Sequence, residues 1–452
     1  MDRLSTSQRY NFLSKSNSTN FYYERIKEFV YNLSESSNIV LPIDVYPDAY
    51  LKSWGFPSGI KLVSEKNGLI FPAAVPDIGC GFRIIKTNLF KSNIGKTTAE
   101  NILELLEVYA GKLSQSRFDR VKGLDINKIL EEGVHYLIKL GIGNETDLMR
   151  MRKSNNTSEA CLLISDSEKE ELKKYFGVCA GHFLEIRIVE EILEPEISNE
   201  LQLSKDQLII IIHAGAMSGK TILLENYYYS AVDFVIQNRL FEVEKVEKGL
   251  FGIPINSEAG LQYLQAASAL INYSHASRHY AHYLIEELFK EYVHTDSKFE
   301  LISDICHSKV EVIENEKVLH ARGLQTLYPS QHINTLSPFK KSGDIGLLAG
   351  EKGTNSHLVA VNPKIKSMDY QCSHGTGKYL NHTRINDLPN KVVKKALNCF
   401  FDTHYDIIND LPKDFFSTNE TLDILQNKYK LITPCLSLAP FINFWGEKDQ
   451  YR

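Results

Sequence analysis

The interpretation of this chain depends first on one stretch, Val75-Pro76-Asp77-Ile78-Gly79-Cys80-Gly81-Phe82-Arg83. It lies between an apolar run over residues 68–75 and a β-like run over residues 82–87. The glycines let the backbone approach a neighbour without an intervening Cβ, so the carboxylate and the thiol on this bend can point at one ion. In proteins generally, an aspartate that stabilises a turn and a cysteine packed as a small hydrophobic residue are more common than a metal-binding pair. The stretch therefore indicates an ion-binding site only together with the histidines further along the chain.

Length, composition and charge limit the classes of protein to which this chain can belong. The chain has 452 residues, 43% hydrophobic and 24% charged, which predicts a globular protein with a substantial core. A net charge of -5 argues against a generally basic nucleic-acid coat protein but leaves room for a local basic groove. Seven cysteines without a CxxC pair favour a reducing compartment. The polar N-terminus and the lack of a membrane-length apolar run, which would need about 20 residues, predict a cytoplasmic protein with no membrane partner.

Helical and strand patterns are mixed along the chain. Apolar spacing predicts helices over residues 21–37, 97–116, 125–140, 166–176, 258–292 and 391–428. Ser257 stands where the N-cap of the longest helix is expected. Strands are predicted over residues 60–64, 82–87, 183–189 and 207–212. A strand pair carrying Cys306-His307 is predicted over residues 301–316, and a β-rich stretch with a glycine-rich turn over residues 346–361. Without strict alternation of strand and helix, this mixture predicts an α+β fold built as one large unit.

Three histidines accompany Asp77 and Cys80 at the ends of predicted strands. His182 precedes one strand, His213 ends the run of four isoleucines, and His307 follows Cys306. One thiolate, three imidazoles and one carboxylate suit a borderline-soft divalent ion such as Mn²⁺, Zn²⁺ or Co²⁺. Five ligands exceed what one tetrahedral ion uses, so a shared thiolate can bridge two ions, an arrangement suited to phosphoryl transfer.

A fourth histidine lies in a glycine-rich loop. His374 is followed by Gly375, Thr376 and Gly377, with Lys378 four residues on. Glycines beside an imidazole and a nearby ammonium group form a sensible setting for a nucleophile that attacks a phosphate.

Two other patterns have simpler explanations. His275, His279 and His282 share one face of the longest helix and can bind a metal, but no glutamate follows the first histidine, and a polar helix face is the alternative. The run from Gly215 to Lys220 resembles a phosphate-binding loop, yet its glycines are one residue too close.

Five motifs come in the order seen in RtcB-type RNA-splicing ligases, and the chain resembles that family over residues 40–446. The motifs are Pro76–Arg83, Gly181–Ile186, Ile212–Gly215, Asp304–His307 and His374–Lys378. Further matches are Pro47-Asp48, residues 272–278, His320–Gly323 and Gly350–Thr354. The resemblance implies an α+β fold with mixed sheets around a central metal cleft. It also implies a single large catalytic domain over residues 38–446, a helical extension over residues 1–37 and a tail over residues 447–452.

The resemblance implies two Mn²⁺ ions bridged by a thiolate. Asp77, Cys80 and His182 would hold one ion, and Cys80, His213 and His307 the other, with Zn²⁺ or Co²⁺ as substitutes. His374 would attack the α-phosphate of GTP to form histidine–GMP. The enzyme would then join RNA 3′-phosphate or 2′,3′-cyclic phosphate ends to 5′-hydroxyl ends, in RNA repair or tRNA splicing. Catalysis would rest on His374, Asp77 and Cys80, and no helper protein is identified by the sequence.

The nucleotide surroundings implied by the resemblance differ from the family pattern. The implied contacts are Gly181, His182, Phe183, Leu184, Glu185, His307, Ser308, Ala349, Gly350, Glu351, Lys352, Ser356, His374, Gly375, Thr376, Gly377 and Trp445. Gly181 and Ser308 replace asparagines, Met217 and Lys378 replace arginines, Glu351-Lys352 replaces Ser-Met, and Trp445 aligns with a guanine-reading lysine. These changes put the guanine preference in question, while the metal ligands and the nucleophile are complete.

Two alternatives remain open from the sequence. The first is a metal-dependent phosphodiesterase or an end-capping nucleotidyltransferase that uses the ions without joining RNA. The second is a non-catalytic RNA-binding relative with a structural metal.

Overall fold

The structure is a computed structural model of the 452-residue chain. It describes residues 6–13, 21–36, 38–52, 56–65, 68–95, 97–99, 101–102, 123–152, 160–177, 182–216, 222–313, 316–350, 354–375 and 418–445. All statements below concern these residues.

The largest sheet of the described residues is antiparallel throughout and carries the metal-ligand candidates. In spatial order its strands are β13 (Ile345–Leu348), β14 (Ser356–Val361), β16 (Ile432–Trp445), β6 (Phe183–Ile192), β7 (Gln207–Ala214), β5 (Gly81–Phe90) and β9 (Phe299–Cys306). Side chains of β7 alternate between two apolar clusters, with Ile210 and Ile212 in one and Ile209 and Ile211 in the other. Burial on both faces explains why this strand is almost continuously apolar.

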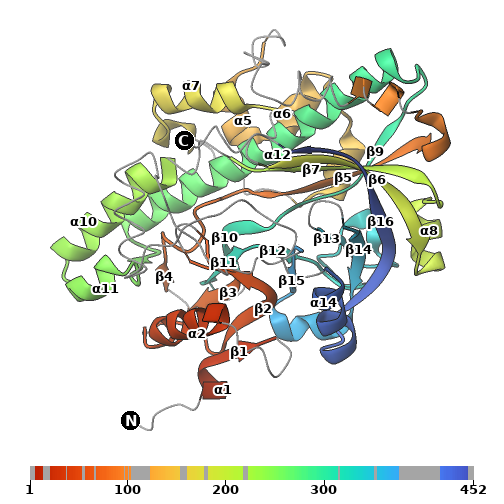
Figure 1. Cartoon of the computed structure of the whole chain (residues 1–452). Helices are drawn as coiled ribbons and strands as arrows, with labels where there is room; N and C mark the ends of the chain where they lie inside the picture. The colour runs from red at the N-terminus through yellow and green to blue at the C-terminus, as the bar shows by residue number, and fades with distance from the viewer. Residues whose placement is uncertain are drawn as a thin grey trace.

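One face of the large sheet is covered by the long helix α12 (Glu258–Tyr292), as Figure 1 shows. Its N-cap is Ser257, as predicted, and the Ser257 side chain accepts a hydrogen bond from Gly260 N. Ala281 and Ile285 of this helix pack on the apolar cluster that includes Ile210. The helix therefore forms a rigid support directly behind the strands that end near Cys80.

A second sheet and several shorter helices complete the fold. The second sheet has the order β1 (Tyr10–Phe12), β2 (Ile43–Tyr50), β3 (Ser58–Ser64), β11 (Lys317–Arg322) and β10 (Ser308–Ile313). Two short ladders pair β4 (Leu69–Ile70) with β8 (Ile253–Pro254), and β12 (Leu324–Thr326) with β15 (Gln371–Ser373). The other helices are α1 (Thr6–Arg9), α2 (Phe21–Ser34), α5 (Ile126–Glu132), α6 (Val134–Lys139), α7 (Asp166–Tyr175), α8 (Pro195–Leu201), α10 (Tyr229–Gln237), α11 (Val243–Glu247) and α14 (Thr418–Asp423).

The predicted α+β fold, with mixed helices and sheets, is confirmed. The helix predicted over residues 125–140 is instead two helices, α5 and α6, because Gly133 between them has a φ of 58° that a continuous helix does not allow. Residues 103–116 and 391–417, where helices were also predicted, lie outside the described residues. No helix in the described part of the chain is long and apolar enough to cross a membrane.

The predicted division at residues 37 and 446 stays a prediction. Helix α2 contributes Ile26 and Val30 to the same apolar cluster as Ile60 and Leu62 of β3. The described part of the N-terminal segment therefore packs on the body of the fold, and residues 447–452 lie outside the described residues.

Candidate active site

A thiol and three imidazoles meet at one edge of the large sheet. Cys80 Sγ lies 3.1 Å from His182 Nε2 and 3.2 Å from His213 Nε2. His213 Nε2 lies 3.0 Å from His307 Nε2. Among the described residues, the group with ligand atoms close enough to hold a metal ion is Cys80, His182 and His213. His307 adjoins this group through His213.

Strand register explains why these residues meet. In the antiparallel ladders, His213 stands opposite Phe82 on one side and Phe183 on the other. The start of β5, the start of β6, the end of β7 and the end of β9 therefore share one edge of the sheet. Cys80 precedes β5 on a turn in which Gly79 has a φ of 76°, and a Cβ there would collide with Ser274.

Aromatic packing holds the imidazoles in place. The ring of Phe82 lies 4.6 Å from that of His213 and 5.0 Å from that of His307, centroid to centroid. Phe183 contacts His213 from the other side, with ring centroids 4.6 Å apart. These contacts restrict the rings, so their nitrogen atoms have little freedom to turn away from the thiol.

The electrostatics of the cluster favour a bound cation. Burial lowers the pKa values of His213 and His307 well below their usual range, and the neighbouring imidazoles lower both further. Burial and the Asp77 carboxylate raise the pKa of the Cys80 thiol. His213 and His307 are therefore neutral, and the ring nitrogens of the cluster lie close to the sulfur. This donor set fits a borderline-soft divalent ion, whose charge would also favour the thiolate.

Asp77 is held by cations beside the cluster. Arg322 Nε donates to its Oδ1 at 3.0 Å, and Lys52 Nζ lies 4.0 Å from its Oδ2. Although burial alone would raise it, these two cations lower the pKa of Asp77 below its usual range. The carboxylate is therefore ionised and adjacent to the cluster, and its role as a metal ligand stays a prediction.

His374 is oriented by a buried carboxylate from a distant strand. His374 Nδ1 lies 3.0 Å from Asp48 Oδ2, and the same oxygen accepts from the backbone N–H groups of His374 at 3.2 Å and Gly375 at 3.3 Å. The Ser373 hydroxyl donates to Asp48 Oδ1 at 2.7 Å. A carboxylate can only accept, so His374 carries its proton on Nδ1 and presents the lone pair of Nε2.

The nucleophile candidate lies beside the ligand candidates. The ring centroids of His374 and His307 are 4.7 Å apart. Gly323, with a φ of 69°, passes so close that a Cβ there would lie 3.0 Å from His374 Cε1. The backbone carbonyl of His374 accepts a hydrogen bond from Ala349 N at 3.0 Å. The structure thus brings His374 and the metal-ligand candidates into one site.

Several residues predicted to contact a nucleotide also make contacts within the protein. Ser308 Oγ lies 3.4 Å from His307 Nδ1, and Gly350 N donates to Ser356 Oγ at 2.9 Å. Glu185 is buried and ion-paired with Arg187 at 2.7 Å. The Leu184 side chain is fully buried in the apolar cluster beneath α12. Their nucleotide contacts stay predictions.

Part of the predicted nucleotide surroundings is outside the described residues. This applies to Gly181, Glu351, Lys352, Thr376, Gly377 and the side chain of Trp445. The backbone of Trp445 pairs with Phe183 at the end of β16, which places it at the same edge of the sheet as the histidine cluster.

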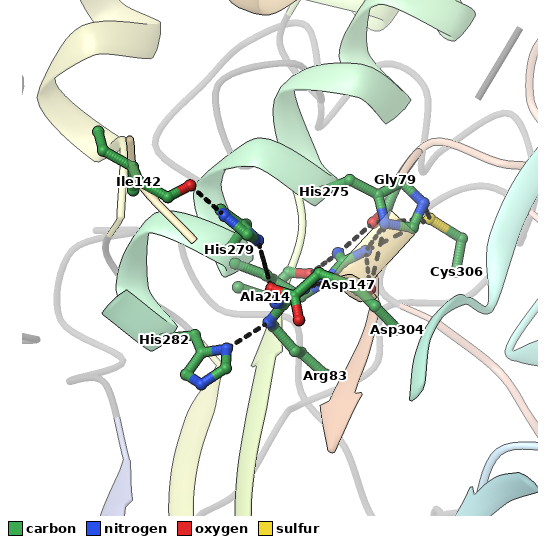
Figure 2. Close-up of polar contacts among 11 residues, drawn as sticks. Gly79, Arg83, Ile142, Asp147, Ala214, His275, His279, His282, Asp304 and Cys306 are labelled. Carbon is green, nitrogen blue, oxygen red and sulfur yellow. Dashed lines mark hydrogen bonds and ion pairs between the residues drawn. The ribbon is translucent and has the colours of Figure 1, made fainter. Parts of the chain in front are cut away.

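The three histidines on α12 belong to a buried hydrogen-bonded network (Figure 2). His275 Nδ1 lies 3.1 Å from Asp304 Oδ1, His279 Nε2 bonds to Ile142 O at 2.8 Å, and Arg83 donates to His282 Nδ1 at 3.1 Å. Burial and the Arg83 charge lower the pKa of His279 to about 3. These contacts support the polar-face explanation of the spacing, with the face buried against the sheet.

Sequence reasoning gave no role to three residues that the structure places in or under the site. They are Asp48, Arg322 and Arg278. All three lie in segments that the resemblance marked without indicating their contacts: Pro47-Asp48, residues 272–278 and His320–Gly323.

Comparisons with known proteins agree on one family. The family model for the tRNA-splicing ligase RtcB matches residues 30–443. The chain is 26% identical to a tRNA-splicing ligase RtcB of Methanococcus maripaludis, over 84% of this chain and 82% of that protein. It is also 26% identical to the RNA-splicing ligase RtcB homolog 1 of Entamoeba dispar, over 78% of this chain and 68% of that protein. With a match over nearly its whole length, the chain belongs to the RtcB family.

Proposed function

We propose that this protein is an RNA ligase that works through a nucleotide bound covalently to His374. It would join RNA 3′-phosphate or 2′,3′-cyclic phosphate ends to 5′-hydroxyl ends, in RNA repair or tRNA splicing. The observation that carries the proposal is the position of His374, which is oriented by Asp48 and lies beside the Cys80–His182–His213–His307 cluster, with its ring centroid 4.7 Å from that of His307.

The cluster would hold two Mn²⁺ ions, replaceable by Zn²⁺ or Co²⁺. Asp77, Cys80 and His182 would hold one ion, and Cys80, His213 and His307 the other. When bound, the ions would neutralise negative charge on the phosphate groups. This assignment is supported by neutral imidazoles, by an already ionised Asp77 and by the short distances from Cys80 Sγ to two imidazole nitrogens.

His374 would act as the nucleophile on the α-phosphorus of GTP. The Nε2 lone pair would form the new N–P bond while pyrophosphate leaves, giving histidine–GMP. Asp48 would keep the proton on Nδ1 and stabilise the positive charge that develops on the ring. The GMP would then pass to the RNA 3′-phosphate, and the 5′-hydroxyl of the second RNA end would displace it.

GTP is the nucleotide that the family implies, and the base preference depends on residues that differ from the family pattern. Glu351, Lys352 and Trp445 are the substitutions expected nearest the base. ATP is therefore the nucleotide to compare with GTP in every assay below.

The proposal is tested by incubating the purified full-length protein with two labelled RNAs, Mn²⁺ and either GTP or ATP. One RNA ends in a 2′,3′-cyclic phosphate and the other begins with a 5′-hydroxyl. We expect a joined product that is lost in His374→Ala and in Cys80→Ala. Opening of the cyclic phosphate by His374→Ala, with no joining by the wild-type protein, would instead support the phosphodiesterase alternative. RNA binding without any change to either end would support the non-catalytic alternative.

A further inference from the structure

A buried guanidinium, that of Arg278, lies between α12 and the segments that hold the ligand cluster. Arg278 of α12 is fully buried. Its Nη1 donates to the backbone carbonyls of Gly79 at 2.8 Å and Ala214 at 2.7 Å. Its Nε and Nη2 donate to Asp304 Oδ1 at 2.9 and 2.8 Å. One side chain therefore bonds to three separate segments of the chain.

Each of these three segments carries a predicted metal ligand. Gly79 immediately precedes Cys80, and Ala214 immediately follows His213. Asp304 lies on β9, which ends at Cys306, immediately before His307. The Gly79 carbonyl belongs to the peptide group bonded to Cys80, and the Ala214 carbonyl lies one residue beyond His213, so a shift of either carbonyl is transmitted to the neighbouring ligand.

Backbone hydrogen bonds join Cys80 O to His307 N and Gly79 N to Ser308 O, both at 2.8 Å, but the ladder between β5 and β7 gives no support at this point. Gly81–Ala214 is the last pair of the ladder between β5 and β7, so Gly79 and Gly215 lie beyond it. The two segments are nevertheless in close contact, since a Cβ on Gly215 would lie 2.8 Å from Cys80 Cα. The carbonyl bonds to Arg278 thus continue the connection between β5 and β7 past the end of the ladder.

The geometry requires a planar, forked donor. One nitrogen of the guanidinium reaches two carbonyls, while the opposite edge reaches a carboxylate. A lysine ammonium carries the same charge but has no fixed fork, so it cannot make both sets of bonds from one position. Asp304 balances the buried charge, and charge-assisted bonds of this kind are stronger than neutral ones.

We infer that Arg278 is a positioning residue for the metal centre. It sets the spacing between Cys80 and His213 by binding the carbonyls of Gly79 and Ala214, and it links both to β9, the strand that ends immediately before His307. This inference rests on the proposed metal centre, and it adds a residue that touches neither the ion nor the substrate.

Arg83 provides a matched control in the same network (Figure 2). It is also fully buried, and it donates to the other oxygen of Asp304 at 3.1 Å. Its remaining bonds go to Asp147 at 2.9 Å and to His279 and His282. Arg83 therefore shares the burial, the charge and the carboxylate of Arg278, while its hydrogen bonds go to side chains and not to the carbonyls beside Cys80 and His213.

The test is Co²⁺ binding by the full-length protein, followed by the thiolate-to-cobalt absorption band and by competition with a chelator. Arg278→Lys should weaken Co²⁺ binding by about 10- to 100-fold and alter the cobalt spectrum, as loss of a group that orients a metal ligand typically does. Arg83→Lys should keep the wild-type affinity and spectrum. Urea unfolding of both variants measures how far each loses stability, and Arg278→Gln replaces Arg278→Lys if the latter does not fold.

The outcomes separate this inference from the proposed metal centre. A folded Arg278 variant with wild-type affinity and spectrum would overturn the inference, as would an Arg83→Lys protein that loses as much affinity as Arg278→Lys. A wild-type protein that does not bind Co²⁺, or whose cobalt spectrum is unchanged in Cys80→Ser, would instead overturn the metal centre itself.

Discussion

Replacement of Asp48 by asparagine tests how this carboxylate acts on His374. Asp48 Oδ2 faces three donors, the backbone N–H groups of His374 and Gly375 and the His374 Nδ1–H. An amide NH₂ cannot face two backbone N–H groups, so the asparagine oxygen should take this position, with its NH₂ toward the Ser373 hydroxyl. The histidine tautomer should therefore survive in Asp48→Asn, and only the negative charge should be lost.

The expected rate loss in Asp48→Asn follows from the loss of this negative charge. A hydrogen bond to a charged group contributes about 1–2 kcal/mol more than a neutral one, which corresponds to a rate loss of about 5- to 30-fold. Asp48→Ala removes the orientation as well and leaves two buried N–H groups without a partner. By comparison with other orienting carboxylates, that variant should lose about 10⁴-fold.

The assay is the single-turnover rate at which the protein is covalently labelled by α-labelled GTP or ATP in Mn²⁺. Asp44→Asn is the control, because Asp44 is buried on the same strand but pairs with Lys61 and accepts from Asn11. Its labelling rate should match that of the wild type. An Asp48→Asn rate as low as that of Asp48→Ala would refute the argument that backbone donors fix the orientation of residue 48. Wild-type rates in both Asp48 variants would refute the role of this carboxylate.

Three further predictions follow from other contacts. Burial lowers the pKa of His320 to about 3, and its Nε2 accepts a hydrogen bond from Phe71 N, so the folded protein keeps this imidazole neutral. The unfolded chain takes up a proton there below about pH 6.5, so the free energy of unfolding falls as the pH drops from about 6.5 toward 3. His320→Gln keeps a hydrogen-bond acceptor that does not titrate. Below pH 6, the free energy of unfolding, measured with urea, should therefore fall less steeply with decreasing pH in this variant than in the wild type, by about 1.4 kcal/mol per pH unit. Parallel pH dependences of the two proteins would contradict this. Gly323→Ala should slow labelling by up to about 10²-fold, since the new Cβ would collide with Ser58 Oγ and crowd the His374 ring; an unchanged rate would count against that crowding. Leu184→Ala should lower the free energy of unfolding by about 2–5 kcal/mol without changing the ratio of GTP to ATP labelling; a changed ratio would place Leu184 in the nucleotide site.

The elements that could be predicted are those with local signals. The long helix was predicted from apolar spacing and a serine cap, and the structure has it over Glu258–Tyr292 with the Ser257 cap. The strand ends that bring Cys80, His182, His213 and His307 together were predicted because each residue adjoins a β-like run. The break at Gly133 was missed, because a glycine inside a helical pattern does not reveal a positive φ.

The contacts that could not be predicted join distant parts of the chain. Asp48 and His374 are 326 residues apart, and only the packing of β2 against the strand before His374 brings them together. Arg278 meets Gly79 and Ala214 across helix and sheet, a contact for which helical spacing gives no signal. The same spacing is compatible with metal ligation by His275, His279 and His282, but the polar face favoured from the sequence agrees with the structure, in which they bond to Asp304, a backbone carbonyl and Arg83. Pattern indicates which residues share a face, and the neighbouring elements decide what that face contacts.

The central claim, that His374 carries the nucleotide, is tested most directly by locating the covalent label. The full-length protein, loaded with Mn²⁺, is incubated with α-labelled GTP and in parallel with ATP, and the labelled peptide is identified by mass spectrometry. We predict an acid-labile nucleoside monophosphate on His374 that is absent from His374→Ala and Cys80→Ala. A label on another residue, or a metal-loaded protein that takes no label from either nucleotide, would contradict the claim.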